Sequence, residues 1–413
     1  MTEGRLGFEG LDACVHCGFC LQACPTFLAT GDESDSPRGR IELMRALERG
    51  ELAATDPALI YHLDRCLGCR GCEPVCPSGV QYAHGLEAAR GRIAAAKGTP
   101  RLARLALWVL TTPGVSGVAY WFARLLRSVL PRGIAGWGRI RFAMGMLAAT
   151  KPGGRRREGA VKGYRPLPPH TALLFRGCVQ QGLFSHVHDA TKRTLGVNGY
   201  AVQDPPGQVC CGALHAHAGL IEEARALARK NIEAFGDGDE PIVVNSAGCG
   251  ALMKEYGHLL GGGDERAARF GARVRDVTEL LATNGKGPIA GAPLDLHVAY
   301  DPPCHLLHAQ RISAEPLKLF AAIPLLQLVP VQGASECCGS AGLFTVLEPE
   351  MSRAVLEPKL EHLRQAAPQI VATGNPGCLM QLGAGLAAAG IRAEVRHPVE
   401  LLDDSYRAAG RYE

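Results

Sequence analysis

Near its N-terminus the chain reads Cys14-Val15-His16-Cys17-Gly18-Phe19-Cys20-Leu21-Gln22-Ala23-Cys24-Pro25. The pattern returns once, as Cys66-Leu67-Gly68-Cys69-Arg70-Gly71-Cys72-Glu73-Pro74-Val75-Cys76-Pro77. In both copies three cysteines stand three residues apart, and a fourth follows after a longer gap and precedes a proline. Three thiolates on so short a loop can surround one compact group, whereas the fourth points away from it. We therefore expect the two copies to exchange their fourth ligands.

This spacing is that of a bacterial ferredoxin with two clusters, in which the fourth Cys of each motif ligates the other cluster. It predicts that one [4Fe–4S] cluster is held by Cys14, Cys17, Cys20 and Cys76, and the other by Cys66, Cys69, Cys72 and Cys24. Structural zinc is the main alternative, but zinc sites usually use two cysteine pairs separated by a dozen or more residues. We therefore predict two [4Fe–4S] clusters in an α-helical ferredoxin-like domain over residues 1–95.

The composition fits a metalloprotein of two or three domains. The chain has 413 residues and sixteen cysteines, all of which fall into regular motifs. In so long a chain this favours metal ligation in a reducing compartment over a disulfide scaffold. The first residues lack the pattern of a signal peptide, and no apolar run is long enough to span a bilayer. We expect a cytoplasmic protein.

The basic charge is concentrated in one segment. The net charge is +4, yet residues 88–165 hold sixteen Lys and Arg against one acid, Glu158. All three tryptophans, Trp108, Trp121 and Trp137, lie among apolar runs in the same segment. We predict a helical basic region over residues 96–165 that ends in the linker Lys151-Pro152-Gly153-Gly154-Arg155-Arg156-Arg157.

Three interpretations of residues 100–150 remain open on the sequence. Arg on one helix face and Trp, Phe and Leu on the other suit the interface of an anionic membrane, which would place the protein peripherally on the cytoplasmic face of the inner membrane. The same pattern fits core helices that join two domains, or a docking surface for a partner subunit. Nucleic-acid binding is not expected, because no recognition motif accompanies the basic residues.

The rest of the chain repeats itself. Cys178 corresponds to Cys304, Cys210-Cys211-Gly212 to Cys337-Cys338-Gly339, and Cys249 to Cys378. Each copy alternates short apolar strands with helical segments, such as residues 220–235 and 351–365, which favours a parallel α/β sheet. We predict two α/β Cys-Cys-Gly domains, over residues 166–285 and 286–413, related by pseudo-two-fold symmetry. The cysteines should collect at the carboxyl ends of the strands.

These eight cysteines form a second set of candidate metal ligands: Cys178, Cys210, Cys211, Cys249, Cys304, Cys337, Cys338 and Cys378. Adjacent cysteines do not easily bind one tetrahedral zinc, because their side chains diverge unless the backbone turns sharply at the following glycine. One interpretation is a further iron–sulfur centre in each half, or one shared between them. The other is a set of buried or redox-active thiols without metal.

The Cys-Cys-Gly repeat resembles the domain of heterodisulfide reductase subunits, lactate-utilisation proteins and iron–sulfur subunits of respiratory dehydrogenases. The heterodisulfide reductases carry a further Cys where this chain has Ser246 and Asn375, so the resemblance does not extend to their non-cubane cluster. The whole order of motifs, with Ser36-Pro37-Arg38-Gly39-Arg40, resembles the iron–sulfur subunits of glycolate oxidase. The iron–sulfur subunit of anaerobic glycerol-3-phosphate dehydrogenase is similarly organised.

The chain has neither a G-x-G-x-x-G motif after a strand nor a P-loop, so we expect no NAD and no flavin on it. Oxidation of a 2-hydroxy acid needs a flavin-like centre that accepts two electrons. The resemblance therefore implies a flavoprotein partner that carries the substrate site, with this chain passing electrons toward quinone as a non-flavin subunit that has no catalytic residues of its own. A thiol or disulfide reductase acting through the Cys-Cys-Gly domains is the alternative from another class.

Overall fold

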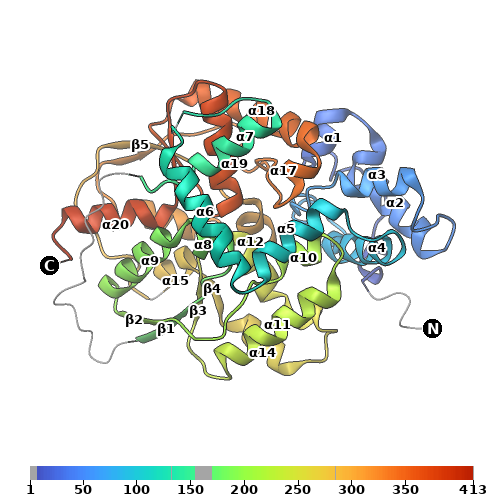
Figure 1. Cartoon of the computed structure of the whole chain (residues 1–413), viewed down its shortest axis with the longest axis horizontal. Helices are drawn as coiled ribbons and strands as arrows, with labels where there is room; N and C mark the ends of the chain where they lie inside the picture. The colour runs from blue at the N-terminus through green and yellow to red at the C-terminus, as the bar shows by residue number, and fades with distance from the viewer. Residues whose placement is uncertain (1–6, 132, 154–169, 284, 413) are drawn as a thin grey trace. The chain divides into compact units, whose positions relative to one another are not determined.

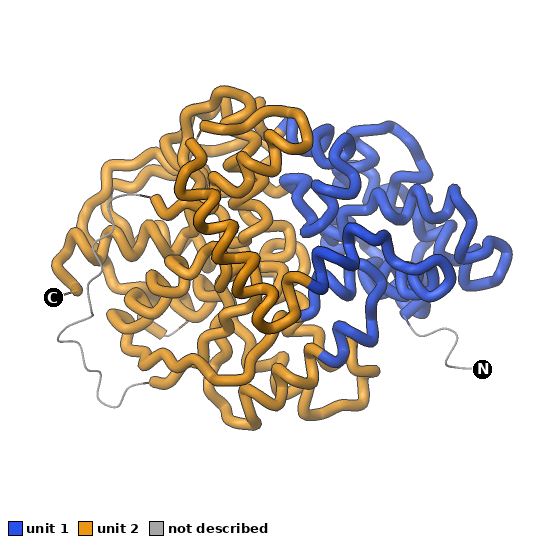
Figure 2. The backbone as a smooth tube through the Cα atoms, viewed as in Figure 1, with its two compact units in different colours: residues 1–108, 212–226, 336–358 blue, residues 109–211, 227–335, 359–413 orange. Residues whose placement is uncertain are grey.

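The computed structural model describes residues 7–131, 133–153, 170–283 and 285–412 (Figure 1). The chain divides into two compact units, coloured separately in Figure 2. Unit 1 comprises residues 1–108, 212–226 and 336–358, and unit 2 comprises residues 109–211, 227–335 and 359–413. The turn that follows each Cys-Cys pair thus belongs to unit 1. The domain boundaries predicted after residues 95, 165 and 285 stay predictions, and residues 154–157 of the predicted linker lie outside the described residues.

Unit 1 is helical where the structure describes it. Prolines occupy the first turns of its first three α-helices, where a missing N–H costs nothing. Ser36 caps one of them by accepting the Gly39 N–H at 3.0 Å. Met44, Leu59 and Leu63 are fully buried in the core that these helices form. Its elements are η2 (Glu9–Leu11), α1 (Pro25–Thr30), η3 (Glu33–Asp35), α2 (Pro37–Glu48), α3 (Pro57–Asp64), α4 (Tyr82–Lys97), α10 (Ala213–His217) and α17 (Phe344–Leu347).

Unit 2 contains two parallel four-stranded sheets within the described residues. The first has the order β2-β1-β3-β4 and the second the order β6-β5-β7-β8, so both copies of the repeat share one topology. Strands β3 and β7 are buried at every residue, as expected for the inner strands of a parallel sheet. This confirms the predicted pair of repeated α/β domains. The strands are β1 (His170–Leu174), β2 (Tyr200–Gln203), β3 (Ile242–Val244), β4 (Val274–Asp276), β5 (Leu296–Tyr300), β6 (Leu326–Leu328), β7 (Ile370–Ala372) and β8 (Glu394–Arg396).

Helices join the two halves of unit 2 into one core. Leu174 and Val243 of the first half belong to the same buried cluster as Val298 and Leu402 of the second. The guanidinium of Arg193 binds both carboxylate oxygens of Asp403 at 2.8 Å. The helices of the first half are α8 (Val179–Leu183), α9 (Ser185–Val197), α12 (Ala247–Lys254), α13 (Tyr256–Leu259), α14 (Glu265–Arg273) and α15 (Val277–Thr283). The second half adds η4 (His305–Ala309), α16 (Glu315–Ala321), α19 (Pro376–Ala388) and α20 (Pro398–Ala408), and α5 (Arg101–Thr111), α11 (Ile221–Phe235) and α18 (Pro349–Ala366) have residues in both units.

The later part of the basic segment forms α6 (Val115–Val129) and α7 (Arg139–Ala148), and α7 packs along α19. The inward face of α6 is anchored by Arg127, which donates to the carbonyls of Thr150 at 2.9 Å and Leu183 at 2.7 Å. On its outward face Val118, Trp121, Phe122, Leu125, Leu126 and Val129 are all about half exposed or more. No residue of α6, all of which is described, is buried, so α6 is not a core helix.

Among the described residues, no single helix is long and apolar enough to cross a bilayer. Helices α5 and α6 together pass that test of length and composition as a bent pair.

Candidate metal centres

The ligands predicted for the two cubanes line two small hollows in unit 1. One hollow is lined by Cys14, Cys17, Cys20 and Cys76, with Cys72 also at its wall. The other is lined by Cys24, Cys66, Cys69 and Cys72. Each hollow thus gathers one full set of four thiols from the crossed scheme, including the fourth Cys of the opposite motif. Four thiols are a donor set that fits an iron–sulfur cube. The ligation itself stays a prediction.

The backbone of the two loops turns in the same way. At the third position of the motif His16 has φ +57° and Gly68 has φ +61°. At the fifth position Gly18 has φ +85° and Arg70 has φ +62°. A left-handed residue between right-handed or extended neighbours curls the chain and can direct successive N–H groups to one side. The shared pattern therefore bends each loop around its hollow, although His16 and Arg70 adopt a conformation that side chains rarely take.

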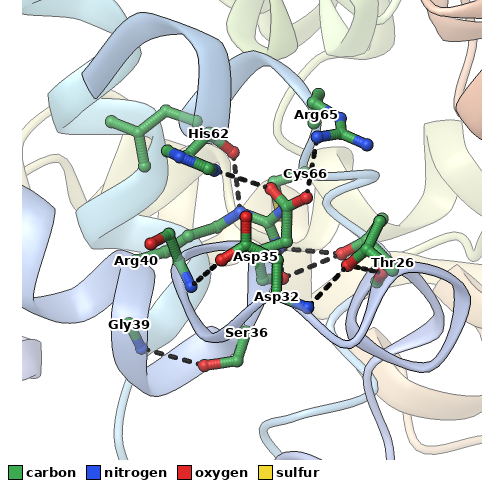
Figure 3. A network of polar contacts seen from close by, with 12 residues as sticks. Thr26, Asp32, Asp35, Ser36, Gly39, Arg40, His62, Arg65 and Cys66 are labelled. Carbon is green, nitrogen blue, oxygen red and sulfur yellow. Dashed lines mark hydrogen bonds and ion pairs between the residues drawn. The ribbon is translucent and has the colours of Figure 1, made fainter. Parts of the chain in front are cut away.

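A buried polar network supports the second hollow (Figure 3). Asp35 has no exposed side-chain surface, and its carboxylate pairs with Arg40 at 3.1 Å and with Arg65 at 2.9 Å. The ring Nδ1 of His62 lies 3.0 Å from the same carboxylate. Arg40 also donates to the Thr26 hydroxyl at 2.9 Å and to the His62 carbonyl at 2.7 Å. Asp32, Asp35 and His62 could be a metal site by proximity, but the two arginines already neutralise Asp35.

This network sets the charge around the thiols. Burial opposes ionisation of Cys66, but the guanidinium groups of Arg40 and Arg90 hold the pKa of its thiol below the ordinary value. Burial and the neighbouring cysteines, Cys69 first, raise the pKa of Cys72 well above the ordinary value. Burial also opposes the charge on Arg40, yet Cys66, Tyr82, Cys24 and Asp35 raise its pKa. Four thiolates can therefore coexist here only beside strong positive charge, which arginine supplies in part and iron would complete.

The first Cys-Cys-Gly half brings four thiols into contact within unit 2. The sulfur of Cys178 lies 3.5 Å from that of Cys210, and the thiol of Cys211 donates to the sulfur of Cys249 at 3.1 Å. The hydrogen bond to Cys210 and burial raise the pKa of Cys178 well above the ordinary value. So dense a set of sulfurs suits a cationic metal centre, since thiolates rather than thiols are metal ligands.

Two further side chains fix the turn at Cys210-Cys211. Tyr256 donates its hydroxyl to the Cys211 carbonyl at 2.8 Å. Asn231 donates to the Cys210 carbonyl at 3.0 Å and to the Tyr256 hydroxyl at 3.2 Å. Gly212 then takes φ +90°, and a Cβ there would lie 3.2 Å from the backbone of Ala224. Glycine is therefore required at position 212, because φ is positive there and because a Cβ would press against a neighbouring backbone.

The second half repeats the local turn. Gly339 has φ +80°, a Cβ there would lie 2.5 Å from the Ser352 carbonyl oxygen, and its N–H donates to the Cys337 sulfur at 3.4 Å. Cys337, Cys338 and Cys378 are buried, and Cys304 is partly buried. Cys337 and Cys338 belong to unit 1, whereas Cys304 and Cys378 belong to unit 2. All sixteen cysteines are described, and none forms a disulfide.

Ser246 and Asn375 lie together in unit 2, where the loops after β3 and β7 meet. The Ser246 hydroxyl donates to the Asn375 side-chain oxygen at 3.4 Å, and the Ala247 N–H donates to the Gly374 carbonyl at 3.1 Å. The side-chain amide of Asn375 also donates to the Cys378 sulfur at 3.5 Å. The two residues that stand in place of cysteines thus link the halves of the repeat.

Comparison with known proteins agrees with this architecture. Residues 10–80 match the model of a 4Fe-4S dicluster domain, and residues 172–254 and 298–383 match that of a cysteine-rich domain. Over 96% of its length the chain is 34% identical to the probable glycolate oxidase iron-sulfur subunit of Bacillus subtilis and to the glycolate oxidase iron-sulfur subunit of Escherichia coli, covering 94% of each. This chain belongs to the glycolate oxidase iron–sulfur subunit family. The family predicted from the order of the motifs is confirmed.

The similarity extends more weakly to other proteins. Over 56% of its length the chain is 30% identical to lactate utilization protein A of Geobacillus kaustophilus, covering 97% of that protein. Among solved structures, a hypothetical protein from Helicobacter pylori is similar at a TM-score of 0.45 and 11% identity, over 98% of this chain and 73% of that one.

The residues that support the thiols were harder to predict than the thiols themselves. Arg40 belongs to the Ser36–Arg40 stretch, but nothing in the sequence shows that its side chain is buried. Asn231 and Tyr256 belong to no motif, and only the fold brings them to the Cys-Cys turn. Of the histidines near the motifs, His215 is buried, and His308 lies 3.1 Å from the Ser335 carbonyl through its Nε2 atom.

Proposed function

We propose that this chain is the iron–sulfur electron-transfer subunit of a flavin-dependent glycolate oxidase or dehydrogenase complex. It accepts electrons from the reduced flavin of a partner flavoprotein, and their eventual acceptor is quinone. The chain takes no part in substrate oxidation by itself. The observation that carries this proposal is the arrangement of eight thiols into two complete four-thiol sets in unit 1. Bound clusters would supply one-electron redox chemistry.

This chain's own residues have two roles in that function. The cysteine loops hold the clusters, with Cys14, Cys17, Cys20 and Cys76 for one and Cys66, Cys69, Cys72 and Cys24 for the other. Arg40, Arg65 and Arg90 place positive charge around the second set, which favours a reduced and more negative centre. Asp35 and the carbonyls of His62 and Cys66 hold these arginines in place.

Further iron–sulfur centres in the Cys-Cys-Gly domains are part of the proposal. The contacts among Cys178, Cys210, Cys211 and Cys249 support a centre in the first half. Total iron tests this: about eight atoms per chain would mean two cubanes only, and about sixteen would mean a four-iron cluster in each repeat as well.

We also propose that the protein works in the cytoplasm and meets the inner membrane peripherally through α6. Its outward apolar stripe and the exposed Arg124 of the same helix are what such an interface needs. A flavoprotein surface could cover the same stripe, and binding to anionic vesicles distinguishes the two.

The electron-transfer role is tested by rapid mixing. The purified, iron-loaded chain is combined with its flavoprotein partner, and glycolate is added while visible cluster absorbance is followed. We expect bleaching only when both the partner and glycolate are present. Bleaching by glycerol-3-phosphate instead would assign the complex to that substrate. The electron-transfer role would be wrong if the isolated chain reduced a disulfide with an artificial electron donor and lost this activity in Cys211→Ala or Cys338→Ala.

A further inference from the structure

Unit 1 contains a cavity of about 270 Å³ that none of the predicted metal centres occupies. Its walls come from α4 and the start of α5, and from the segments after both Cys-Cys-Gly sequences, including Leu214 of α10 and Phe344 of α17. All of its lining residues belong to unit 1. The volume suits a molecule of one or two rings, and it is too small to hold a long side chain of that molecule as well.

The lining favours a neutral molecule with an apolar body. Leu67, Ile93, Leu343, Phe344 and Leu347 give it apolar walls. The charged residues around it are two cations, Arg90 and Lys97, and two carboxylates, Asp64 and Glu348. Their formal charges cancel, so the cavity offers no excess positive charge for a carboxylate such as glycolate.

One polar group in the cavity lacks a partner. The hydroxyl oxygen of Thr99 is buried and has no hydrogen-bond partner among the residues that the structure describes. A buried hydroxyl left in this state costs free energy. A ligand with a carbonyl oxygen would accept its hydrogen bond, which makes Thr99 the natural anchor for such a ligand.

The cavity also touches the second predicted cluster site. Cys66 lines both this cavity and the hollow that it shares with Cys24, Cys69 and Cys72. Arg90 fixes this wall: it donates to the Cys66 carbonyl at 2.7 Å, the Leu63 carbonyl at 2.9 Å and the His217 carbonyl at 3.2 Å. A ring bound here would lie beside a residue that is itself a predicted ligand.

We propose that this cavity binds the ring of a quinone, with one ring carbonyl accepting a hydrogen bond from Thr99. The proposal rests on the proposed function and locates its electron acceptor. Reduction of the quinone to a quinol takes two electrons, which come from the reduced flavin of the partner, and two protons, which come from water. A quinone ring is neutral, flat and apolar and has carbonyl oxygens at its ends. It therefore matches the apolar walls, the cancelling charges and the Thr99 hydroxyl of the cavity.

The test is calorimetric titration of the iron-loaded full chain with a short-tail ubiquinone. Thr99→Val removes the hydroxyl while keeping the shape, and we expect about a tenfold weaker affinity, the usual effect of losing about 1.4 kcal/mol. Leu347→Trp, at a wall residue that is 38% exposed, fills the cavity and should abolish binding. Thr283→Val is the matched control, since the Thr283 hydroxyl bonds the Glu279 carbonyl at 2.7 Å in unit 2.

Unchanged affinity in both Thr99→Val and Leu347→Trp would overturn the proposal, as would tighter binding of glycolate than of quinone. Circular dichroism of each variant checks that it folds. The wild-type complex is assayed in parallel for glycolate-dependent reduction of a soluble dye. If the dye is reduced but no quinone binds, the quinone site is wrong and the electron-transfer function stands. If the dye is not reduced, the proposed function itself fails.

Discussion

The guanidinium Nη1 of Arg40 lies 3.9 Å from the sulfur of Cys24, a predicted ligand of the second cluster. Arg40 is 1% exposed, and it pairs at 3.1 Å with the buried carboxylate of Asp35, which Arg65 also contacts at 2.9 Å. A fixed cation so close to a ligand sulfur stabilises the reduced form of a cluster more than the oxidised form. Arg40 therefore contributes both to the folding of this region and to the reduction potential of the cluster predicted there.

Replacing Arg40 by Met should lower the reduction potential of one cluster and leave the other nearly unchanged. It should also reduce the free energy of unfolding by about 3–5 kcal/mol, because part of a buried ion network is lost. A redox titration followed by electron paramagnetic resonance measures the first effect, and urea denaturation the second. The matched control is Arg49→Met, whose side chain forms an exposed ion pair with Glu51 and should change neither quantity. A potential that stays at the wild-type value would mean that Arg40 is only structural.

Crossed ligation can be tested by pairs of substitutions. In the crossed scheme Cys24 and Cys66 hold the same cluster, whereas Cys20 and Cys24 hold different ones. Cys24→Ala/Cys66→Ala should therefore lose about four irons per chain, and Cys20→Ala/Cys24→Ala about eight. Iron analysis of the purified variants gives the answer. The reverse result would show that each motif holds its own cluster with all four of its cysteines.

The sequence predicts those parts of the structure that spacing and periodicity determine. The distances along the chain between cysteines indicate the two ligand sets, and alternating strands and helices indicate the repeated parallel sheets. The sequence does not predict burial of a charged side chain, because the partners of Arg40 come from three elements that only the folded chain brings together. It also cannot show which way an amphipathic helix faces. On α6 the apolar stripe points outward, and a periodicity analysis gives the same pattern for either orientation.

The buried imidazole of His188 predicts sensitivity to acid. Its Nε2–H donates to the Arg176 carbonyl at 3.0 Å, and its Nδ1 accepts from the Asn245 side-chain amide at 3.1 Å. One nitrogen donates and the other accepts, which is the pattern of a neutral imidazole. Burial lowers the pKa of His188 from 6.5 to about 4. Because the folded-state pKa is depressed, the corresponding stability is fully present above pH 6.5 and is lost as the pH falls toward 4.

Between pH 7 and pH 5 this one group should remove about 2 kcal/mol of stability. The His188→Gln variant should lose correspondingly less free energy of unfolding over the same pH range, although it is less stable than the wild type at pH 7. Urea denaturation of both proteins at the two pH values measures the difference. His297→Gln, which changes an exposed ring on β5, should behave like the wild type. Equal acid losses in His188→Gln and wild type would show that His188 is not the sensitive group.

The outward stripe of α6 predicts binding to an anionic membrane. Trp121 is 55% exposed, Leu125 is 53% exposed and Val129 is 74% exposed, and they lie along one side of the helix. Apolar and aromatic side chains at an interface bind in proportion to the area that they bury, and neighbouring Arg adds attraction to acidic lipid. Trp121→Glu/Leu125→Glu should therefore reduce co-sedimentation with phosphatidylglycerol vesicles severalfold while leaving the fold intact, since neither side chain is buried.

The control for this experiment is Val187→Ala in α9, which weakens the core of unit 2 but does not change the stripe. It should lower thermal stability and keep vesicle binding. Binding of the wild type should decrease with added salt and with neutral phosphatidylcholine in place of the acidic lipid, because the arginine contribution is electrostatic. If the wild type does not bind vesicles but the double Glu variant no longer assembles with the flavoprotein, then the stripe is a subunit interface, and the membrane proposal is wrong.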